Sequence, residues 1–427
     1  MLITLPIFTL LFALVIGAPI YMCLLAAGVV YFAMNPNLGT FVIPQLMNAG
    51  LMKYTFLAIP FFIMSGICMN STGITRRLMK FSEVVAGKLP GGLAHVNIIL
   101  STLMGGLSGS NIADAASDCK MLVPEMEKRG FSRAYSAAVT AASSLITPII
   151  PPGIGMVLYA FIANVSVGKM FLAGIVPGIL MMVWEMVANH FVSKRRGYVP
   201  ARDTWATPRE ILREGRSAFL SFLFPVIIIV GIRMGVFTPT EAGAVAVAYS
   251  LLLGTLLFRE TKLKDIWQAL IDTALSTCTS LMIFASANVF SYFVTNEKLS
   301  DMLAAFVLSF ATTPITFLLV FIVLVLIMGM FLDGTTMMII LVPLFLPTAT
   351  QLGIDPIYFG IIFLLCSAVG NITPPVGVVM YTVCDLIDVK VKDFTIESMP
   401  FYLVLVLNLL LMVIFPQIIM FLPNLLF

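Results

Sequence analysis

Long apolar runs with very few charges are the feature that most constrains this chain. Between Lys298 and Lys390 the sequence contains no Lys or Arg. Of all 427 residues, 60% are hydrophobic and 11% are charged, whereas an average globular protein has about 25% charged residues. A soluble fold could not cover its surface with so few polar side chains. The sequence therefore predicts an all-α polytopic membrane protein in a lipid bilayer, with room for roughly ten spans or more.

The same composition excludes disordered chains, secreted disulfide scaffolds and nucleic-acid-binding proteins. The net charge is only +3. The first basic residue is Lys53 and the first acid is Glu83, so no positively charged region precedes the opening apolar stretch, and we expect residues 2–32 to form one retained span. The cysteines stand singly, with no CxxC pair, and are expected to be buried free thiols: Cys23, Cys68, Cys119, Cys278, Cys366 and Cys384.

Clusters of basic residues indicate which loops are cytoplasmic. The longest polar stretch, 194–216, is also the most basic, and the positive-inside rule places it in the cytoplasm. Two further basic clusters, 76–88 and 120–133, flank a Gly- and Ser-rich stretch at 91–119. That stretch is too short for two full spans, so we expect a re-entrant hairpin that enters from the cytoplasmic side. Residues 265–275 are expected to form a short interfacial helix.

The second half of the chain shows the opposite pattern. The loop at 351–356 lies in the run without Lys or Arg, so we expect it to be external. The apolar stretch at about 315–350 is interrupted by glycines and prolines, and it is expected to form a second hairpin that enters from outside.

An internal repeat relates these two regions. The segment from Thr147 to Tyr159 resembles the segment from Ile372 to Tyr381, with a two-residue gap near the Thr-Pro. Upstream matches follow in the same order: Met104-Gly105 with Met328-Gly329, Val123-Pro124 with Val342-Pro343, Gly130 with Gly353, and Tyr135 with Tyr358. Each unit reads as a hairpin followed by a helix that proline interrupts. Opposite loop charges make this an inverted repeat, and paired broken helices mark the binding site of secondary transporters.

Polar residues concentrate at the hairpin tips and helix breaks. The first tip, residues 105–114, offers Ser and Asn oxygens and flexible glycines that suit an ion and substrate site; the alternative is a small-residue packing motif. Asp333 is the only acid between Asp301 and Asp355, and it is either a functional intramembrane carboxylate or a helix N-cap. Asp114 and Asp118 either pair with the nearby Lys120 or face a cavity.

Catalytic motifs are missing. The two histidines form no HExxH motif, Asp333 lacks the partner of an aspartyl protease, and no GxxxxGK[ST] sequence is present. An enzyme is therefore not expected. A channel is the nearest rival to a carrier, but the paired hairpins and the absence of a repeated pore filter argue against it.

The chain resembles the large membrane subunit of TRAP (tripartite ATP-independent periplasmic) transporters, most nearly that of a sialic acid system. The resemblance lies in residues 105–110, Ala113-Asp114, 148–155 with Tyr159, 237–244 and 371–377. It implies a Na⁺-coupled importer in the bacterial inner membrane, working by an elevator motion, with Na⁺ as coupling ion and no cofactor. The implied partners are a small membrane subunit and a periplasmic binding protein that delivers a small organic acid. The alternative substrate is a C4-dicarboxylate or another organic acid.

The resemblance also implies site residues and a division of the chain. The first sodium site would use Ser108, Ser110, Asn111, Thr147, Ile149 and Pro151; the second would use Gly329, Asp333, Thr336, Gly370, Asn371 and Thr373. Substrate would contact Ser110, Ser143, Gly153 and Asp333, although Gly153 replaces a serine found in many relatives. Residues 1–90 and 166–314 would form scaffold helices, with an arm helix at 259–275. Residues 91–165 and 315–387 would form the transport repeats, and 388–427 a last span.

Overall fold

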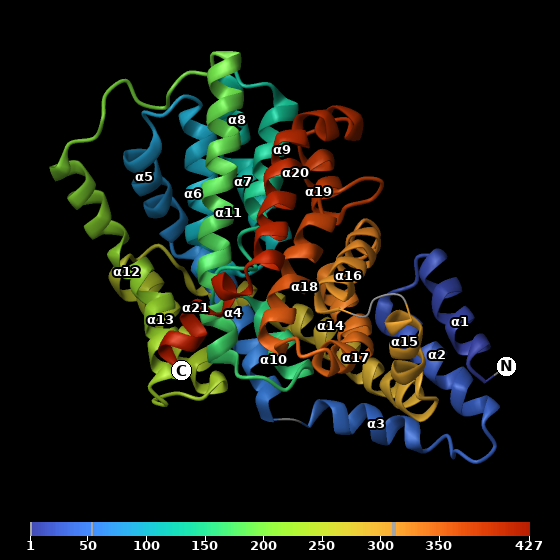
Figure 1. Cartoon of the computed structure of the whole chain (residues 1–427). Coiled ribbons are helices and arrows are strands. Elements are labelled where there is room, and N and C mark those ends of the chain that lie inside the picture. The colour runs from blue at the N-terminus through green and yellow to red at the C-terminus, as the bar shows by residue number, and fades with distance from the viewer. Residues whose placement is uncertain (1, 53, 310–312) are drawn as a thin grey trace.

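The computed structural model describes residues 2–52, 54–309 and 313–427, and every regular element in these ranges is helical (Figure 1). Within these ranges, six helices are long and apolar enough to cross a membrane: α11 (Val167–Arg196), α12 (Pro208–Arg233), α13 (Pro239–Leu252) with its π turn to Leu257, α14 (Leu263–Asn296), α17 (Gly334–Gln351) and α20 (Val391–Ile414). A bent pair, α4 (Ala58–Ser71) and α5 (Ile74–Ala86), can add a seventh. This number is lower than the ten spans or more for which the composition leaves room, because much of the apolar sequence forms helices of 10–17 residues.

The N-terminal region differs from the prediction of a single span. The chain forms α1 (Thr4–Val15) and α2 (Ile20–Met34), which pack against each other. Between them Gly17 adopts a φ of 77°, a left-handed conformation that turns the chain, and Pro19 precedes α2. Next come α3 (Val42–Leu51) and a 3₁₀ turn at Tyr54–Leu57, and α14 packs against α2, α3 and α4.

Two further expectations need correction. Residues 265–275 do not form a separate interfacial helix, because they begin the 34-residue α14 without a break. The six cysteines are free, but Cys278 on α14 is exposed whereas the other five are buried. An apolar sequence context does not distinguish a side chain that faces lipid from one that faces the protein core.

A pair of helices joined by a short turn occupies each of the two segments where a hairpin was expected. In the first, α6 (Gly92–Ser108) and α7 (Asn111–Met121) join at Gly109, whose φ is 60°. Ser101 Oγ of the first arm donates to Asp118 Oδ2 of the second over 3.1 Å, so the arms fold back on each other. In the second, α16 (Pro314–Gly329) folds back on α17, with the ring of Phe321 5.2 Å from that of Phe345. α15 (Leu299–Leu308) packs beside α17.

Two interrupted helices follow the hairpins. α8 (Val123–Lys128) leads to α9 (Arg133–Ser144), which breaks before α10 (Ile154–Ile162); α18 (Pro356–Gly370) breaks before α19 (Val378–Leu386). α10 and α19 each contain nine residues. The matched glycines Gly130 and Gly353 adopt φ angles of 85° and 77°. The repeat alignment drawn from the sequence is therefore reproduced in local structure.

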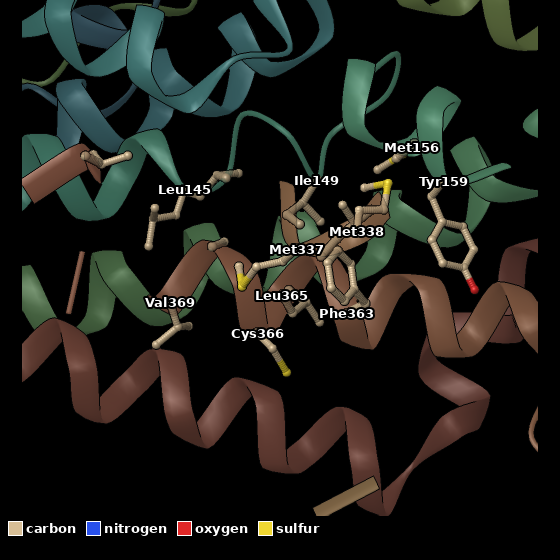
Figure 2. Close-up of a cluster of buried hydrophobic side chains, with 14 of the residues drawn as sticks. Leu145, Ile149, Met156, Tyr159, Met337, Met338, Phe363, Leu365, Cys366 and Val369 are labelled. Carbon is tan, nitrogen blue, oxygen red and sulfur yellow. The ribbon is translucent and has the colours of Figure 1, made fainter. Parts of the chain in front are cut away.

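Helices of the two repeats pack against each other. α6 and α7 pack against α9, and α16 and α17 pack against α18. The second arm of each hairpin also packs on the second half of the other repeat's broken helix, α7 on α19 and α17 on α10. Figure 2 shows the shared apolar cluster, with Ile149 of the first break and Met156 and Tyr159 of α10 beside Met337 and Met338 of α17 and Phe363 of α18. The hydroxyl of Tyr159 donates to the carbonyl of Pro356 over 2.6 Å.

Long helices complete the arrangement around the repeats. In Figure 1, α11 stands beside α6, α9 and α20, whereas α1, α2 and α3 lie away from it, at the right and lower right of the view. α11 packs against α20, α6 and the last helix, α21 (Pro416–Leu426). Gly174 of α11 faces Ile149 and Met156, and Gly178 faces Ile150, so small residues allow α11 to approach the first break closely.

Candidate functional site

A cavity of about 210 Å³ lies where the two hairpin tips meet the broken helices. Residues of the first tip, including Ser110 and Asn111, line it together with Asp333 of the second tip. Asn371 of the second break also lines it. Positions more than two hundred residues apart thus share one polar cavity inside an otherwise apolar chain.

Three helices begin at this cavity. Its lining includes the first residues of α7, α10 and α17, which are Asn111, Ile154 and Gly334. The first amides of a helix have no partner within that helix, and its N-terminus carries a partial positive charge. Three such termini around one cavity favour an anionic group without any Lys or Arg in the lining.

Ser110 and Asp333 occupy equivalent positions at the two tips. Ser110 is the N-cap of α7, and its Oγ accepts from the amide of Ala113 over 3.4 Å. Asp333 is the N-cap of α17; one carboxylate oxygen accepts from the amide of Thr336 at 2.9 Å and the other from its hydroxyl at 2.7 Å. The N-cap that the sequence offered for Asp333 is therefore confirmed, and the same carboxylate also lines the cavity.

Asn371 presents an unused acceptor. The residue is 5% exposed, and its Oδ1 has no hydrogen-bond partner within the described ranges. Its backbone carbonyl accepts from the amides of Val379 and Met380 at 3.0 and 3.3 Å, which ties the break to the start of α19. A buried acceptor without a donor is uncommon and suits a bound cation or a donor group of a ligand.

Carbonyl groups of the first break face the glycines of the first tip. A Cβ added to Gly105 would lie 3.2 Å from the carbonyl oxygen of Thr147, and one added to Gly106 would lie 3.2 Å from that of Pro151. The carbonyl of Ile149 instead faces Gly174 of α11. Because Gly105 and Gly106 have no side chains, the carbonyl oxygens of Thr147 and Pro151 face the backbone of the first tip directly.

A buried polar network supports this tip from behind. The hydroxyl of Thr147 donates to Asp114 Oδ2 at 2.9 Å, and Ser101 hydrogen-bonds both Asp118 and Ser143 at 3.1 Å. The network continues from Ser143 to Asn97 and from Asn97 to Thr140. Asp114 and Asp118 are thus buried acceptors for hydroxyl groups, and Lys120 is exposed rather than paired with them.

The structure brings together some of the predicted site residues and separates others. Ser110, Asn111, Asp333 and Asn371 line the cavity. The side chain of Ser108 lies outside the described part of the chain. The remaining predicted residues lie behind or beside the lining: Ser143, Thr147, Ile149, Pro151, Gly153, Gly329, Thr336, Gly370 and Thr373.

Two polar lining residues, Thr335 and Ser367, were not among the predicted site residues. Thr335 follows the cap of α17, and Ser367 lies one helical turn before Asn371 on α18. The i, i+4 spacing between Ser367 and Asn371 was the available signal, because it places both side chains on one helix face. In contrast, the described residues contain no group of three or more His, Cys, Asp or Glu side chains that could hold a metal ion.

Paired hairpins and broken helices around one polar cavity define a membrane transporter. The family described as "Tripartite ATP-independent periplasmic transporter, DctM component" matches residues 7–418. The chain belongs to this family.

Three relatives illustrate the range of the family. The sialic acid TRAP transporter large permease SiaM of Vibrio cholerae is 36% identical over 96% of this chain and 95% of its own length. The 2,3-diketo-L-gulonate TRAP transporter large permease YiaN of Escherichia coli is 34% identical over 96% of each chain. The C4-dicarboxylate TRAP transporter large permease DctM of Pseudomonas aeruginosa is 35% identical over 87% of this chain and 86% of its own.

A solved structure has a similar fold. The YdaH transporter of Alcanivorax borkumensis aligns with a TM-score of 0.65 and 14% identity, over 96% of this chain and 98% of its own. The chain is therefore an integral protein of the bacterial inner membrane and a transporter permease rather than an enzyme. Membership of a tripartite system implies a small membrane subunit and a periplasmic binding protein.

Proposed function

We propose that this chain is the permease of a Na⁺-coupled importer for a small organic acid that a periplasmic binding protein delivers. The observation that carries the proposal is the cavity between the hairpin tips. Three helix N-termini surround it, and Asn371 Oδ1 lies unpaired in its wall. The helix termini suit the carboxylate of the acid, and the unpaired oxygen suits a cation or a donor group of the substrate.

We place two sodium sites at the two breaks. At the first, the carbonyl oxygens of Thr147 and Pro151 face the tip that carries Ser110 and Asn111. At the second, Asp333 and Asn371 supply oxygens, and Gly329 meets Gly370. Carbonyl, amide and carboxylate oxygens are hard ligands that suit a hard cation, and broken helices in transporters supply such oxygens near the middle of the membrane. The carbonyl of Ile149 does not join the first site in this proposal, because it faces α11.

Transport would follow an elevator motion in which the two repeats move together. α7 of the first repeat packs on α19 of the second, and α17 of the second repeat packs on α10 of the first. These contacts and the hydrogen bond from Tyr159 to Pro356 support a single moving body. We include α11 and α20 in that body rather than in the scaffold, because Gly174 and Gly178 pack α11 onto the first break and α20 packs against α9 and α18. The hairpins would enter the membrane from opposite sides.

Sialic acid is the substrate class that we favour, because the V. cholerae relative named for it aligns over nearly the whole chain at 36% identity. A C4-dicarboxylate is the second candidate, since the P. aeruginosa relative named for that substrate is 35% identical. Asp333 is the one charged residue among the described residues that line the cavity, so the charge of the lining does not distinguish the two substrate classes.

Reconstitution tests this proposal. The chain would be placed in liposomes with its small membrane subunit and cognate binding protein, and uptake of radiolabelled N-acetylneuraminate and succinate would be measured. We expect uptake to require an inward Na⁺ gradient and to cease when K⁺ replaces Na⁺. Counterflow from preloaded liposomes would identify a carrier. Uptake that needs no Na⁺ would contradict the coupling, and flux without counterflow would indicate a channel.

A further inference from the structure

The outer face of α11 carries an apolar groove that the transport site does not use. The groove has a volume of about 590 Å³ and runs between the start of α6 and the second half of α11. Val183, Val187 and Phe191 recur at one-turn intervals along α11, and all three are exposed. His95 forms part of the wall, and its ring centroid lies 6.4 Å from that of His190.

Two unpaired cations stand at one end of this groove. Lys194 and Arg195 continue the same face of α11, one turn beyond His190 and Phe191. Both are exposed, and neither forms an ion pair within the described ranges, whereas the adjacent Arg196 pairs with Glu397 at 2.6 Å. Lys88, next to the groove residue Leu89, already donates to the carbonyl of Asp203.

The length of the groove corresponds to one leaflet of a bilayer. From Val183 to Lys194 the helix rises about 16 Å at 1.5 Å per residue, and half of a hydrocarbon core is about 15 Å thick. The basic end belongs to the cluster that the positive-inside rule places in the cytoplasm. The groove therefore lies at the depth of acyl chains in the inner leaflet, and the two cations lie at the depth of the headgroups.

We propose that this groove is a binding site for an anionic phospholipid. One acyl chain lies along Val183, Val187 and Phe191, and the phosphate contacts Lys194 and Arg195. An apolar groove that ends in unpaired cations is complementary to this class of lipid, because basic pockets between helices on the cytoplasmic side favour anionic headgroups. A zwitterionic lipid can fill the apolar groove with an acyl chain, but its headgroup brings no net negative charge to Lys194 and Arg195.

Native mass spectrometry of the purified full chain tests the site. The protein would be mixed with phosphatidylglycerol or phosphatidylcholine of identical acyl chains, and the lipid retained would be measured. We expect phosphatidylglycerol to be retained preferentially. Lys194→Gln with Arg195→Gln should weaken its retention by about fivefold per charge removed. Lys262→Gln with Lys264→Gln, an exposed basic pair at the start of α14, is the matched control and should change nothing.

A second variant tests the apolar half of the site. Val187→Trp fills the groove and should reduce retention of both lipids, and Val183→Phe serves if that variant folds poorly. Equal retention of both lipids by the native chain would overturn the proposal, as would equal losses in the two basic pairs. Displacement of the lipid by inorganic phosphate would show that only an anion is recognised, and would also overturn it.

Discussion

The backbones of Gly329 and Gly370 meet at the second hairpin tip, where a Cβ added to Gly370 would lie 2.7 Å from the Cα of Gly329. Seven residues after Gly370, the amide of Gly377 donates to the carbonyl of Met330 over 2.8 Å. The second break and the second tip are therefore joined by direct backbone contact. Any side chain at this contact must push the two segments apart.

This contact yields the first prediction. Gly370→Ala should reduce transport strongly and lower thermal stability, because overpacking of this kind costs about 1–3 kcal/mol. Uptake in liposomes and thermal unfolding would be measured on the same preparation. Gly215→Ala is the matched control, since a Cβ there meets only the ring of Phe81 at an ordinary 3.6 Å. Native uptake by Gly370→Ala would show that the tip and the break need not touch.

Asp333 supports a prediction that separates its two roles. Asparagine caps helices about as well as aspartate, whereas alanine costs about 1 kcal/mol at an N-cap. Asp333→Asn should therefore keep the stability of the native protein but lose most uptake, and Asp333→Ala should lose both. Asp355, which caps α18 through the amides of Ile357 and Tyr358, is the control. Its alanine variant should lose stability and retain the native Na⁺ dependence. Full uptake by Asp333→Asn would show that the carboxylate serves only as a helix cap.

The two asparagines of the cavity provide a third prediction. Asn111→Ala and Asn371→Ala each remove an amide oxygen from the cavity wall. Each variant should raise the Na⁺ concentration needed for half-maximal uptake, by severalfold or more. Asn424→Ala, at an exposed position of α21, controls for an asparagine outside the cavity. If both cavity variants keep the native Na⁺ dependence, neither oxygen binds the coupling ion.

The inverted repeat is tested by accessibility. In a Cys278→Ser background, which removes the one exposed native thiol among the six cysteines, Gly353→Cys should react with an impermeant maleimide on intact cells. Gly130→Cys should react only after permeabilisation. Both glycines have positive φ angles, so Gln351→Cys and Lys128→Cys provide neighbouring exposed positions without that strain. Labelling of both positions from the same side would make the repeats parallel and would contradict the proposed elevator.

Much of the repeat architecture could be predicted from the sequence. The match of Gly130 with Gly353 located two equivalent turns, because glycine readily adopts the positive φ that a turn requires. The Thr-Pro segments located two breaks, because proline removes an amide donor from a helix. The division of residues 2–32 into α1 and α2 was missed. An apolar run of that length can lie in a bilayer either as one spanning helix or as two shorter helices packed together, so hydropathy does not distinguish the two arrangements.

Part of the candidate site could be predicted in the same way. Ser110 was found because it supplies an oxygen in a Gly-rich tip, and Asp333 because it is the only acid between Asp301 and Asp355. Ser143 was expected to contact substrate but instead joins the network around Asn97 and Ser101. Ser367 was not expected and lines the cavity. Ser143 and Ser367 are both serines near a break, and their shared residue type does not tell which face of each helix points toward the cavity.

The sequence by itself determined that this chain resides in a membrane, that it is helical, and that two related units carry its polar residues. These are properties of composition and of local backbone chemistry. Only the tertiary structure decided which polar groups share a cavity and which support it from behind. That choice depends on how each helix is rotated against its neighbours, and the rotation is set by contacts between distant segments, such as Gly329 with Gly370 and Gly174 with Ile149.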